Sequence, residues 1–500
     1  MMEGLLAGFA SVLQPQNLLF SLLGAFIGTM IGVLPGIGPT AAIAMLLPLT
    51  LGLDPVTAII MIAGIYYGTC YGGSTTAILV NIPGEAQSVV TCIDGYQMAR
   101  NGRAGVAIGM AAIASFIAGT LGAVAIGLVS VPLINFAIRF GPPEFFILMA
   151  LGFAVLLVLS KASPVKSGIM ICAGLALSFV GQDAVTGVPR FTFGMPELLD
   201  GISVVTVAMG LFGLGEVLHN LERLQARTVD HVPIKNLLPT REDWRLSAAP
   251  ILRGSGLGFL IGLLPGGGAT LASFISYAVE KHVAKDPSRF GKGAIEGVAG
   301  PEAANNAGAA GAFIPLLTLG LPGNPVTAIL LSALVLHGVA PGPLMIEKNP
   351  QIFWGVVASM YVGNAMLLVL NLPLVGVWVQ LLRVPYRVLF PSLILFMLIG
   401  AYSINNNLFD VVMLLVFGVA GYVLRKLEFD TAPLILAFVL GQPIELALRQ
   451  SLMMSRGAPE FLLTRPIALG VLAAIVVVIA LPMLKPARRI IVQARAASDD

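Results

Sequence analysis

Apolar stretches dominate the chain, and they recur from Leu18 to the C-terminus with few charged residues inside them. Windows of roughly 17 to 25 apolar residues are long enough to cross the hydrocarbon core of a bilayer as helices. The stretches lack the strict alternation of apolar and polar residues that a transmembrane β-barrel requires. The pattern therefore predicts an all-α polytopic membrane protein with about 12 transmembrane helices, because each helix satisfies its own backbone in lipid.

The composition agrees with a membrane protein and excludes several other classes. Of the 500 residues, 57% are hydrophobic and only 11% are charged, which is more apolar surface than a water-soluble domain hides. The net charge of +3 is small and scattered, so it does not indicate nucleic-acid binding. The three cysteines form no CxxC pair and the four histidines have no metal-ligand spacing. Neither a disulfide scaffold nor a metal site, beyond a sodium ion, is predicted.

Proline and glycine interrupt the apolar stretches at matched places. The sequence LPGIGPT at 34–40 returns as LPGGGAT at 264–270, with an offset of 230 residues. A second pair, NIPGEA at 81–86 and GLPGNP at 320–325, is offset by 239 residues. Repetition of Pro/Gly-broken hydrophobic segments in the same order is typical of secondary transporters. We therefore predict two internal repeats, each with re-entrant or discontinuous helices.

A long polar stretch divides the chain. Residues 219–253 are basic, and by the positive-inside rule we expect them to form a cytoplasmic connecting loop. Residues 1–218 would be the first transmembrane repeat, and 254–484 the second repeat with additional C-terminal helices. The basic segment 485–500 is then expected to be a cytoplasmic tail.

A broken helix at membrane depth frees backbone groups that need a partner. Carbonyls at the end of one half-helix suit a dehydrated cation, and amides at the start of the next suit an anion. A kink with a threonine cap would explain one isolated break, but four matched breaks favour a binding site. The predicted substrate-binding residues at the breaks are Pro35, Gly36, Gly38, Thr40, Asn81, Pro265, Gly266, Gly268, Thr270, Pro322 and Gly323.

Uncharged polar residues between the breaks extend this prediction. Ser74, Thr75 and Thr76 lie in one apolar stretch, and Asn305 and Asn306 lie in another. Close helix packing explains the small residues there, but it does not explain adjacent asparagines, at least one of which needs a polar partner. All five are predicted to bind substrate. The predicted coupling-ion residues are Gly36, Thr40, Gly266, Thr270, Glu302 and Thr318.

Glu302 has two interpretations. Because it follows Pro301, it could lie in the first turn of a helix at the membrane edge, where the helix dipole favours a carboxylate. Alternatively, an intramembrane carboxylate is a candidate cation ligand or proton site. Asp54 and Asn324, each followed by a proline, are predicted to be N-caps.

Three function classes remain to be separated: transporter, channel and enzyme. A GxxxxGK[ST] phosphate loop and an HExxH motif are both missing from the sequence, so neither direct use of ATP nor a zinc protease is indicated. An enzyme has little support, and no cofactor is predicted beyond a coupling cation. An anion channel or a facilitator without ion coupling is the alternative to a secondary transporter, although a channel does not need two sets of matched breaks.

Several stretches carry a resemblance to a known family. GVLPGIGPT, GLLPGGGAT, YYGTCYGGSTTAILVNIPGEAQ and GPEAANNAGAAGAFIPLLTLGLPGNP resemble the large transmembrane subunit of the tripartite tricarboxylate transporter family, the TctA type. The PEAANN stretch is far more specific than a glycine pattern, and the resemblance covers nearly the whole chain.

The resemblance, rather than the composition, implies partners and a location. It implies a multi-pass protein of the bacterial inner membrane that takes a carboxylate such as citrate from a periplasmic binding protein. It also implies a small transmembrane subunit as partner, and symport driven by a sodium or proton gradient. Alternating access would move one part of the helix bundle against another.

Overall fold

The computed structural model describes residues 1–34, 38–160, 162–222, 234, 236–264, 268–382, 384–458 and 462–480. Within these ranges the chain is mostly helical, and the one sheet is a hairpin of two short strands. The prediction of an all-α fold is confirmed.

The elements up to the long polar stretch are α1 (Met2–Val12), α2 (Pro15–Val33), α3 (Pro39–Leu46), η1 (Leu47–Thr50), α4 (Pro55–Val80), η2 (Ala86–Ser88), α5 (Val89–Met98), η3 (Ala99–Arg103), α6 (Ala104–Ala137), α7 (Pro142–Leu159), α8 (Pro164–Ser178), β1 (Gly181–Gln182), β2 (Pro189–Arg190), η4 (Pro196–Leu198), α9 (Val204–Ala208), η5 (Met209–Leu214) and α10 (Gly215–Glu222). Those after it are α11 (Arg241–Gly262), α12 (Gly268–Val283), η6 (Pro287–Arg289), α13 (Glu296–Gly311), α14 (Phe313–Leu319), α15 (Pro325–Leu336), α16 (Met345–Lys348), α17 (Pro350–Asn371), α18 (Val375–Leu381), α19 (Tyr386–Asn405), α20 (Leu408–Lys426), α21 (Ala432–Met454) and α22 (Pro466–Ala480). Two helices extend into the stretch predicted as a connecting loop, since α10 reaches Glu222 and α11 begins at Arg241.

Eight helical segments in the described part of the chain are long and apolar enough to cross a membrane, and six shorter apolar helices accompany them. The long segments are Pro15–Val33, Pro55–Val80, Ala86–Ala137, Val204–Glu222, Pro350–Asn371, Arg387–Asn405, Leu408–Lys426 and Ala432–Met454. The chain is therefore a membrane protein by length and composition of its helices. The expected number of about 12 spans stays a prediction.

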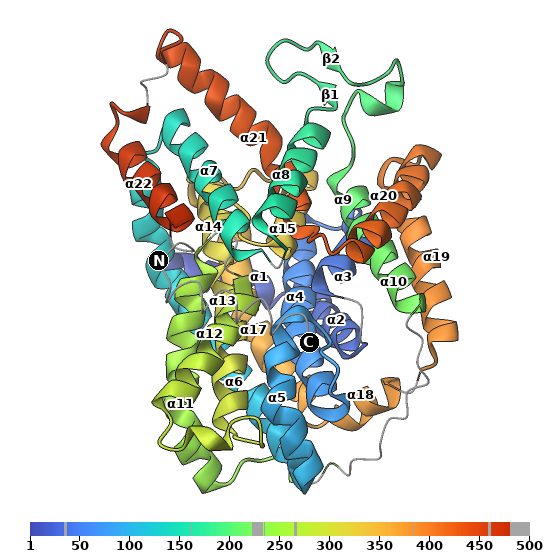
Figure 1. The fold of residues 1–500 in the computed structure, drawn as a ribbon, viewed down its shortest axis with the longest axis vertical. Coiled ribbons are helices and arrows are strands. Elements are labelled where there is room, and N and C mark those ends of the chain that lie inside the picture. Colours follow the sequence, from blue (N-terminus) through green and yellow to red (C-terminus); the bar gives the residue numbers. More distant parts are fainter. Residues whose placement is uncertain are drawn as a thin grey trace.

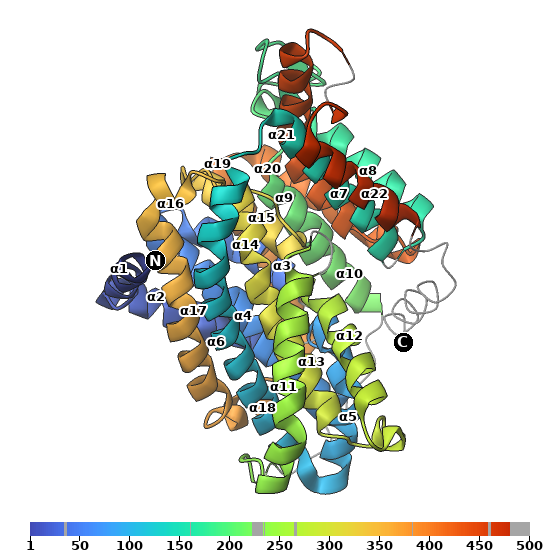
Figure 2. The ribbon, with the colours of Figure 1, turned by 90° about the vertical axis from the view of Figure 1, so that its left-hand side faces the viewer.

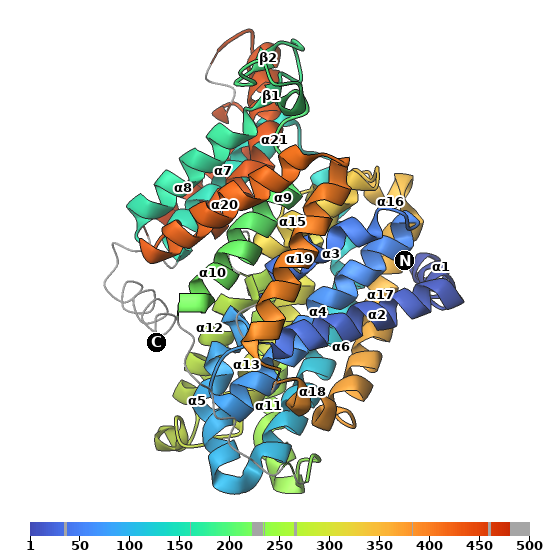
Figure 3. The same cartoon turned by 90° about the vertical axis from the view of Figure 1, so that its right-hand side faces the viewer.

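The helices form two groups along the long axis of the molecule. Helices α7, α8, α21 and α22 pack on one another at the top of Figure 1, and the β1–β2 hairpin lies beside the upper end of α21. Helices α5, α6, α11, α12 and α13 lie together at the lower end, and the side views show the same separation (Figures 2 and 3). Helices α2 and α4 pack closely between the two groups.

Two helix pairs, α2 with α4 and α11 with α13, are packed through glycines with matching spacing. A Cβ added at Gly28 would overlap the Ile65 carbonyl, and one added at Gly258 would overlap the Ala304 carbonyl. Gly258 follows Gly28 by 230 residues and Ala304 follows Ile65 by 239, the same offsets as the two pairs of Pro-Gly breaks. Small residues let helix backbones approach closely in lipid, and both pairs use them at equivalent positions.

The two breaks of the second pair, which follow α4 and α14, have the same local structure. The C-cap of α4 is Asn81 and that of α14 is Gly320, and both residues have left-handed backbone conformations, with φ of 55° and 68°. After the break, the Glu85 N–H donates to the Ser88 hydroxyl at 3.3 Å, and the Asn324 N–H donates to the Thr327 hydroxyl at 3.0 Å. At each break, therefore, a helix ends in a left-handed C-cap, and in the segment that follows a backbone N–H donates to the hydroxyl three residues later.

The predicted N-caps are confirmed. The Asp54 carboxylate accepts the Val56 N–H at 3.1 Å at the start of α4, and the Asn324 side-chain oxygen accepts the Thr327 N–H at 2.9 Å at the start of α15. In both helices a proline occupies the first turn, where its missing N–H costs nothing.

Candidate functional site

A buried carboxylate, Glu302, forms the centre of a polar cluster among α4, α5, α6 and α13. Its side chain is fully buried. One carboxylate oxygen accepts the Ser74 hydroxyl at 2.7 Å and the Ser115 hydroxyl at 3.4 Å, and the other accepts the Thr91 hydroxyl. Three hydroxyl donors from three different helices therefore stabilise this carboxylate.

The structure corrects the first interpretation of Glu302. Helix α13 begins at Glu296 and runs through Pro301 without a break, so Glu302 lies in the second turn and not at a helix start. The proline does not end the helix, because α13 is buried among neighbouring helices, where an interior proline is tolerated. Glu302 is an interior carboxylate, which leaves the second interpretation.

A second carboxylate, Glu85, lies beside this cluster, immediately after the Pro-Gly break that follows α4. It is 5% exposed. The Gln87 amide donates to Glu85 Oε1 and also lies 2.9 Å from the Cys70 sulfur. Glu85 Oε2 is buried and has no hydrogen-bond partner. Glu85 is therefore a buried acid with half of its carboxylate unsatisfied.

The two predicted asparagines differ in their contacts. The Asn306 amide donates to the Ser115 hydroxyl at 2.7 Å and to the Glu302 backbone carbonyl at 3.1 Å. Asn305 is fully buried, lies beside Glu85, and has no hydrogen bond of normal geometry at either side-chain atom. The expectation that at least one asparagine has a polar partner is confirmed by Asn306.

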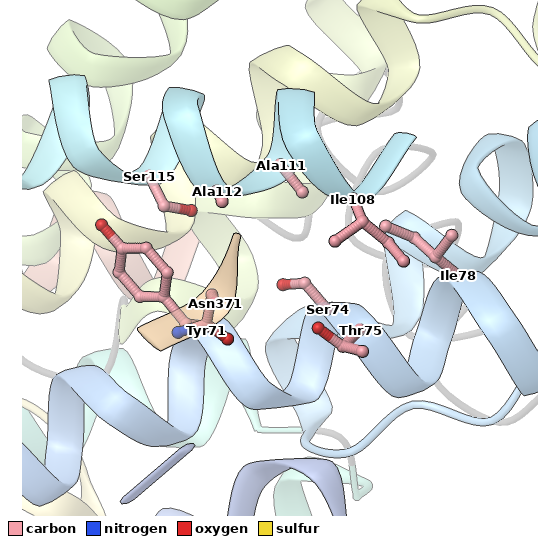
Figure 4. A pocket seen from close by; sticks show the side chains of 9 residues that line it. All are labelled: Tyr71, Ser74, Thr75, Ile78, Ile108, Ala111, Ala112, Ser115 and Asn371. Atoms are coloured by element: carbon pink, nitrogen blue, oxygen red, sulfur yellow. The ribbon is translucent and has the colours of Figure 1, made fainter. Parts of the chain in front are cut away.

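A small cavity adjoins the cluster between α4 and α6. In Figure 4 the side chains of Tyr71, Ser74 and Ser115 point into it. Asn371 also lines the cavity. Its side-chain amide oxygen and the Tyr71 hydroxyl are buried and have no hydrogen-bond partner. The cavity has a volume of about 10 Å³, room for about one water molecule, which is far below the range of about 300–1,000 Å³ that is typical of ligand pockets. In this conformation it suits water or an ion better than a tricarboxylate.

The cluster and the cavity are polar but contain no basic side chain among the described residues. Neither Glu85 nor Glu302 takes part in any ion pair within the described ranges, and the cavity lining is uncharged. Two buried carboxylates without a cation cannot both stay charged at low cost, because burial penalises the ionised form. The arrangement can bind a cation or a proton, and its hydroxyls and amides can hydrogen-bond a carboxylate.

The structure brings only part of the predicted site together. Ser74 and Thr75 line the cavity, while Asn305, Asn306 and Glu302 lie in or beside the cluster. Thr76 and Thr318 instead donate hydrogen bonds to backbone carbonyls. Thr76 donates to the Val33 carbonyl at the end of α2, and Thr318 donates to the Ile314 carbonyl within α14. The cluster residues missed from the sequence are Tyr71, Glu85, Thr91, Ser115 and Asn371.

The residues predicted at the first pair of breaks are described in part. Pro35, Gly36, Pro265 and Gly266 lie outside the described residues. Gly38 is the N-cap of α3 and Thr40 lies in its first turn, so Thr40 is not the cap. Gly268 begins α12 with φ of 56°, and Thr270 follows in the first turn. At the second pair, Asn81 is exposed, whereas Pro322 and Gly323 are buried.

Comparison with known proteins gives a consistent result over most of the chain. The model of the tripartite tricarboxylate transporter TctA family matches residues 18–436. An "Uncharacterized 52.8 kDa protein in TAR-I ttuC' 3'region" of Agrobacterium vitis is 50% identical over 491 residues, covering 98% of each chain. An "Uncharacterized protein in TAR-II ttuC' 3'region" of the same organism is 52% identical over 231 residues, covering 46% of this chain and 96% of that protein. No solved structure matches the chain.

Proposed function

The chain belongs to the tripartite tricarboxylate transporter TctA family, and on this premise we propose that it imports tricarboxylates or related carboxylates, driven by a sodium or proton gradient. The family is one of transporters, and its name implies a tripartite system. The observation that carries the proposal is the family match over residues 18–436. The buried cluster around Glu302, which contains acids, hydroxyls and amides among apolar helices, agrees with it.

The partners belong to the same proposal. A periplasmic carboxylate-binding protein delivers the substrate, and a small transmembrane subunit completes the membrane complex in the bacterial inner membrane. The family membership supports both. The identity of the carboxylate then depends chiefly on the binding protein, and citrate is the first substrate to test.

We further propose that the substrate carboxylates bind the amides at the Pro-Gly breaks together with Ser74, Thr75, Asn305 and Asn306. The uncharged lining of the cavity supports this for the hydroxyls, and its small volume implies that the helices around it separate to admit a tricarboxylate. The coupling ion would bind close by, in the acidic cluster around Glu302.

Alternating access between two repeats would supply the movement. The matched offsets of 230 and 239 residues support the repeats. They connect the breaks, the glycine contacts and the hydrogen bonds that follow the second pair of breaks with their counterparts in the other half of the chain. A transporter built from two such repeats exposes its site to one side of the membrane at a time.

Uptake by reconstituted proteins tests this function. The chain, its small subunit and the binding protein are placed with vesicles, and labelled citrate is added with an imposed sodium or proton gradient. We expect accumulation above equilibrium that requires one of the gradients and all three proteins. Flux through this chain alone that never exceeds equilibrium would instead identify a channel or facilitator.

A further inference from the structure

Two buried carboxylates from opposite halves of the chain lie on either side of one stretch of α4. Ser74 binds the Glu302 carboxylate, while a Cβ added at the preceding Gly73 would contact the Glu85 side chain. Gln87, which donates to Glu85, also contacts Cys70, one helical turn before Ser74. Because both carboxylates lie against two consecutive residues of α4, they are expected to repel each other when both are ionised.

The two carboxylates accept different numbers of hydrogen bonds from the protein. Glu302 accepts three hydroxyl hydrogen bonds, which favour its ionised form. Glu85 accepts one amide hydrogen bond at Oε1, and its Oε2 is buried without a partner. When two like charges share a buried site, one group ionises and the other keeps its proton. The unequal donors make Glu85 the group that holds the proton.

We propose that Glu85 is a proton-binding site, with the proton on Oε2, and that the Glu85–Glu302 pair carries a single negative charge. Binding forms one O–H bond with a proton from the aqueous phase, and release returns that proton to water, so no other reactant is needed. That this proton drives carboxylate import is the part that rests on the proposed function. The binding of the proton does not depend on it.

The other ionisable groups on the packed elements do not neutralise this pair. Asp94, on α5, accepts the backbone N–H groups of Gly291, Gly293 and Ala294 as well as the Tyr277 hydroxyl. Glu280, on α12, forms an ion pair with Arg253 of α11 at 2.5 Å. The remaining neighbours are the phenols of Tyr66 and Tyr71 and the thiol of Cys70 on α4, and the thiol of Cys92 on α5, none of which can supply a positive charge.

Asn305 supplies an independent indication that the site takes a ligand. Its side chain is fully buried beside Glu85, and neither its oxygen nor its nitrogen makes a hydrogen bond of normal geometry, although Glu85 is close enough to interact with it. A buried polar side chain without a well-formed hydrogen bond is costly, so its presence calls for a better partner than an ionised Glu85 alone provides. A protonated Glu85 is such a partner, since its new O–H can donate while its other oxygen still accepts.

Infrared difference spectroscopy of the purified full-length chain tests the site directly. The C=O stretch of a protonated carboxyl group is followed as the pH is raised from acidic to alkaline values. We expect the wild type to retain a protonated carboxyl at neutral pH, Glu85→Gln to lose that band, and the exposed-site control Glu347→Gln to keep it. A neutral-pH spectrum without the band, or a band that persists in Glu85→Gln, would overturn the proposal.

A second variant keeps the test decisive if Glu85→Gln does not fold. In Glu302→Gln the repulsion between the acids is removed, so the proton should leave Glu85 at lower pH than in the wild type. An unchanged titration midpoint contradicts the pair. Replacing choline chloride with sodium chloride at equal ionic strength should leave the band in place, whereas its loss would make sodium the ligand instead of a proton.

Transport separates this inference from the proposed function. In the reconstituted system, accumulation driven by a proton gradient should be lost in Glu85→Gln and retained in Glu347→Gln. If Glu85→Gln still accumulates substrate with the proton gradient, its proton is not the coupling ion. If the wild type accumulates no carboxylate, the proposed function fails, while the infrared result still decides whether Glu85 binds a proton.

Discussion

The Ser74 hydroxyl on α4 donates a 2.7 Å hydrogen bond to the Glu302 carboxylate on α13, 228 residues further along the chain. This bond connects the two halves of the sequence inside the buried cluster. Because α4 precedes one Pro-Gly break and α13 leads into another through α14, a movement of either helix changes the surroundings of Glu302.

Replacing Ser74 by alanine tests this connection. The variant Ser74→Ala removes one of three donors from a buried carboxylate, and we expect a loss of about 1–3 kcal/mol in unfolding free energy. Unfolding of the purified protein in detergent measures it. The control Ser332→Ala removes a hydroxyl that donates only within its own helix, to Ala328, and should change stability by less than about 0.5 kcal/mol. Equal effects of the two variants would contradict a special role for Ser74.

The glycine contacts between α11 and α13 give a second prediction. A Cβ at Gly258 overlaps the Ala304 carbonyl, whereas a Cβ at Gly256, two residues away on the same helix, meets nothing within 4 Å. We expect Gly258→Ala to destabilise the protein by about 1–3 kcal/mol through overpacking. Gly256→Ala should be neutral or stabilising by up to about 1 kcal/mol, because alanine favours the helix.

Thermal unfolding of both variants side by side measures the difference. The same substitution at Gly28 should behave like that at Gly258, because Gly28 meets the Ile65 carbonyl in the same way. A tolerated Gly258→Ala would show that the two helices are free to move apart.

Asn305 distinguishes a structural residue from a binding residue. Asn305 gains a hydrogen-bond partner only while Glu85 holds its proton, so at a pH above the titration of Glu85 its replacement by leucine, which is similar in size, should leave stability unchanged or raise it. Uptake in the reconstituted system should nevertheless fall, because the polar group that faces Glu85 is lost. Asn101→Leu, at an exposed position, serves as the control and should transport like the wild type. Normal uptake by Asn305→Leu would remove Asn305 from the proposed site.

The β1–β2 hairpin provides a pH-dependent prediction outside the membrane-spanning segments. The backbone N–H groups of Thr186 and Val185, together with Arg449, hold the pKa of Asp183 well below its usual range. A lowered pKa in the folded state stabilises the hairpin above the unfolded pKa of about 3.9, and this contribution is lost as the pH falls through the folded pKa. The hairpin should therefore stay ordered from neutral pH down to about pH 4.

Hydrogen exchange of the hairpin amides, corrected for the intrinsic pH dependence of exchange, checks this behaviour. Asp183→Asn should lose protection of residues 183–190 already at pH 7. The control Asp200→Asn changes an exposed carboxylate in the same connection and should keep that protection. Equal protection in both variants would mean that the Asp183 contacts do not order the hairpin.

The sequence predicts the helical membrane fold and several helix boundaries because these depend on local chemistry. Long apolar windows mark the helices, and the Asx-Pro pairs at Asp54 and Asn324 mark helix starts that the structure confirms. The position of Glu302 was predicted wrongly in one of its two interpretations. A local rule places Pro301 near a helix start, but burial of α13 among other helices lets the helix continue through it.

The site could be predicted only in part because its contacts join distant segments. Ser74, Asn305, Asn306 and Glu302 stand out as polar residues in apolar surroundings. Thr91 and Ser115 do not, since a hydroxyl inside a helix commonly bonds to its own backbone. Only the packing of α5 and α6 against α13 turns these two hydroxyls toward Glu302, over sequence separations of 211 and 187 residues.

Accumulation of carboxylate against its own concentration gradient tests the central claim most directly. Vesicles containing the complete tripartite system are loaded with unlabelled citrate, given labelled citrate outside at lower concentration, and exposed in turn to an inward sodium gradient and an inward proton gradient. We predict net uptake that one gradient drives and that an ionophore for the same ion abolishes. Net movement that always follows the citrate gradient, whichever ion gradient is imposed, would contradict a secondary transporter.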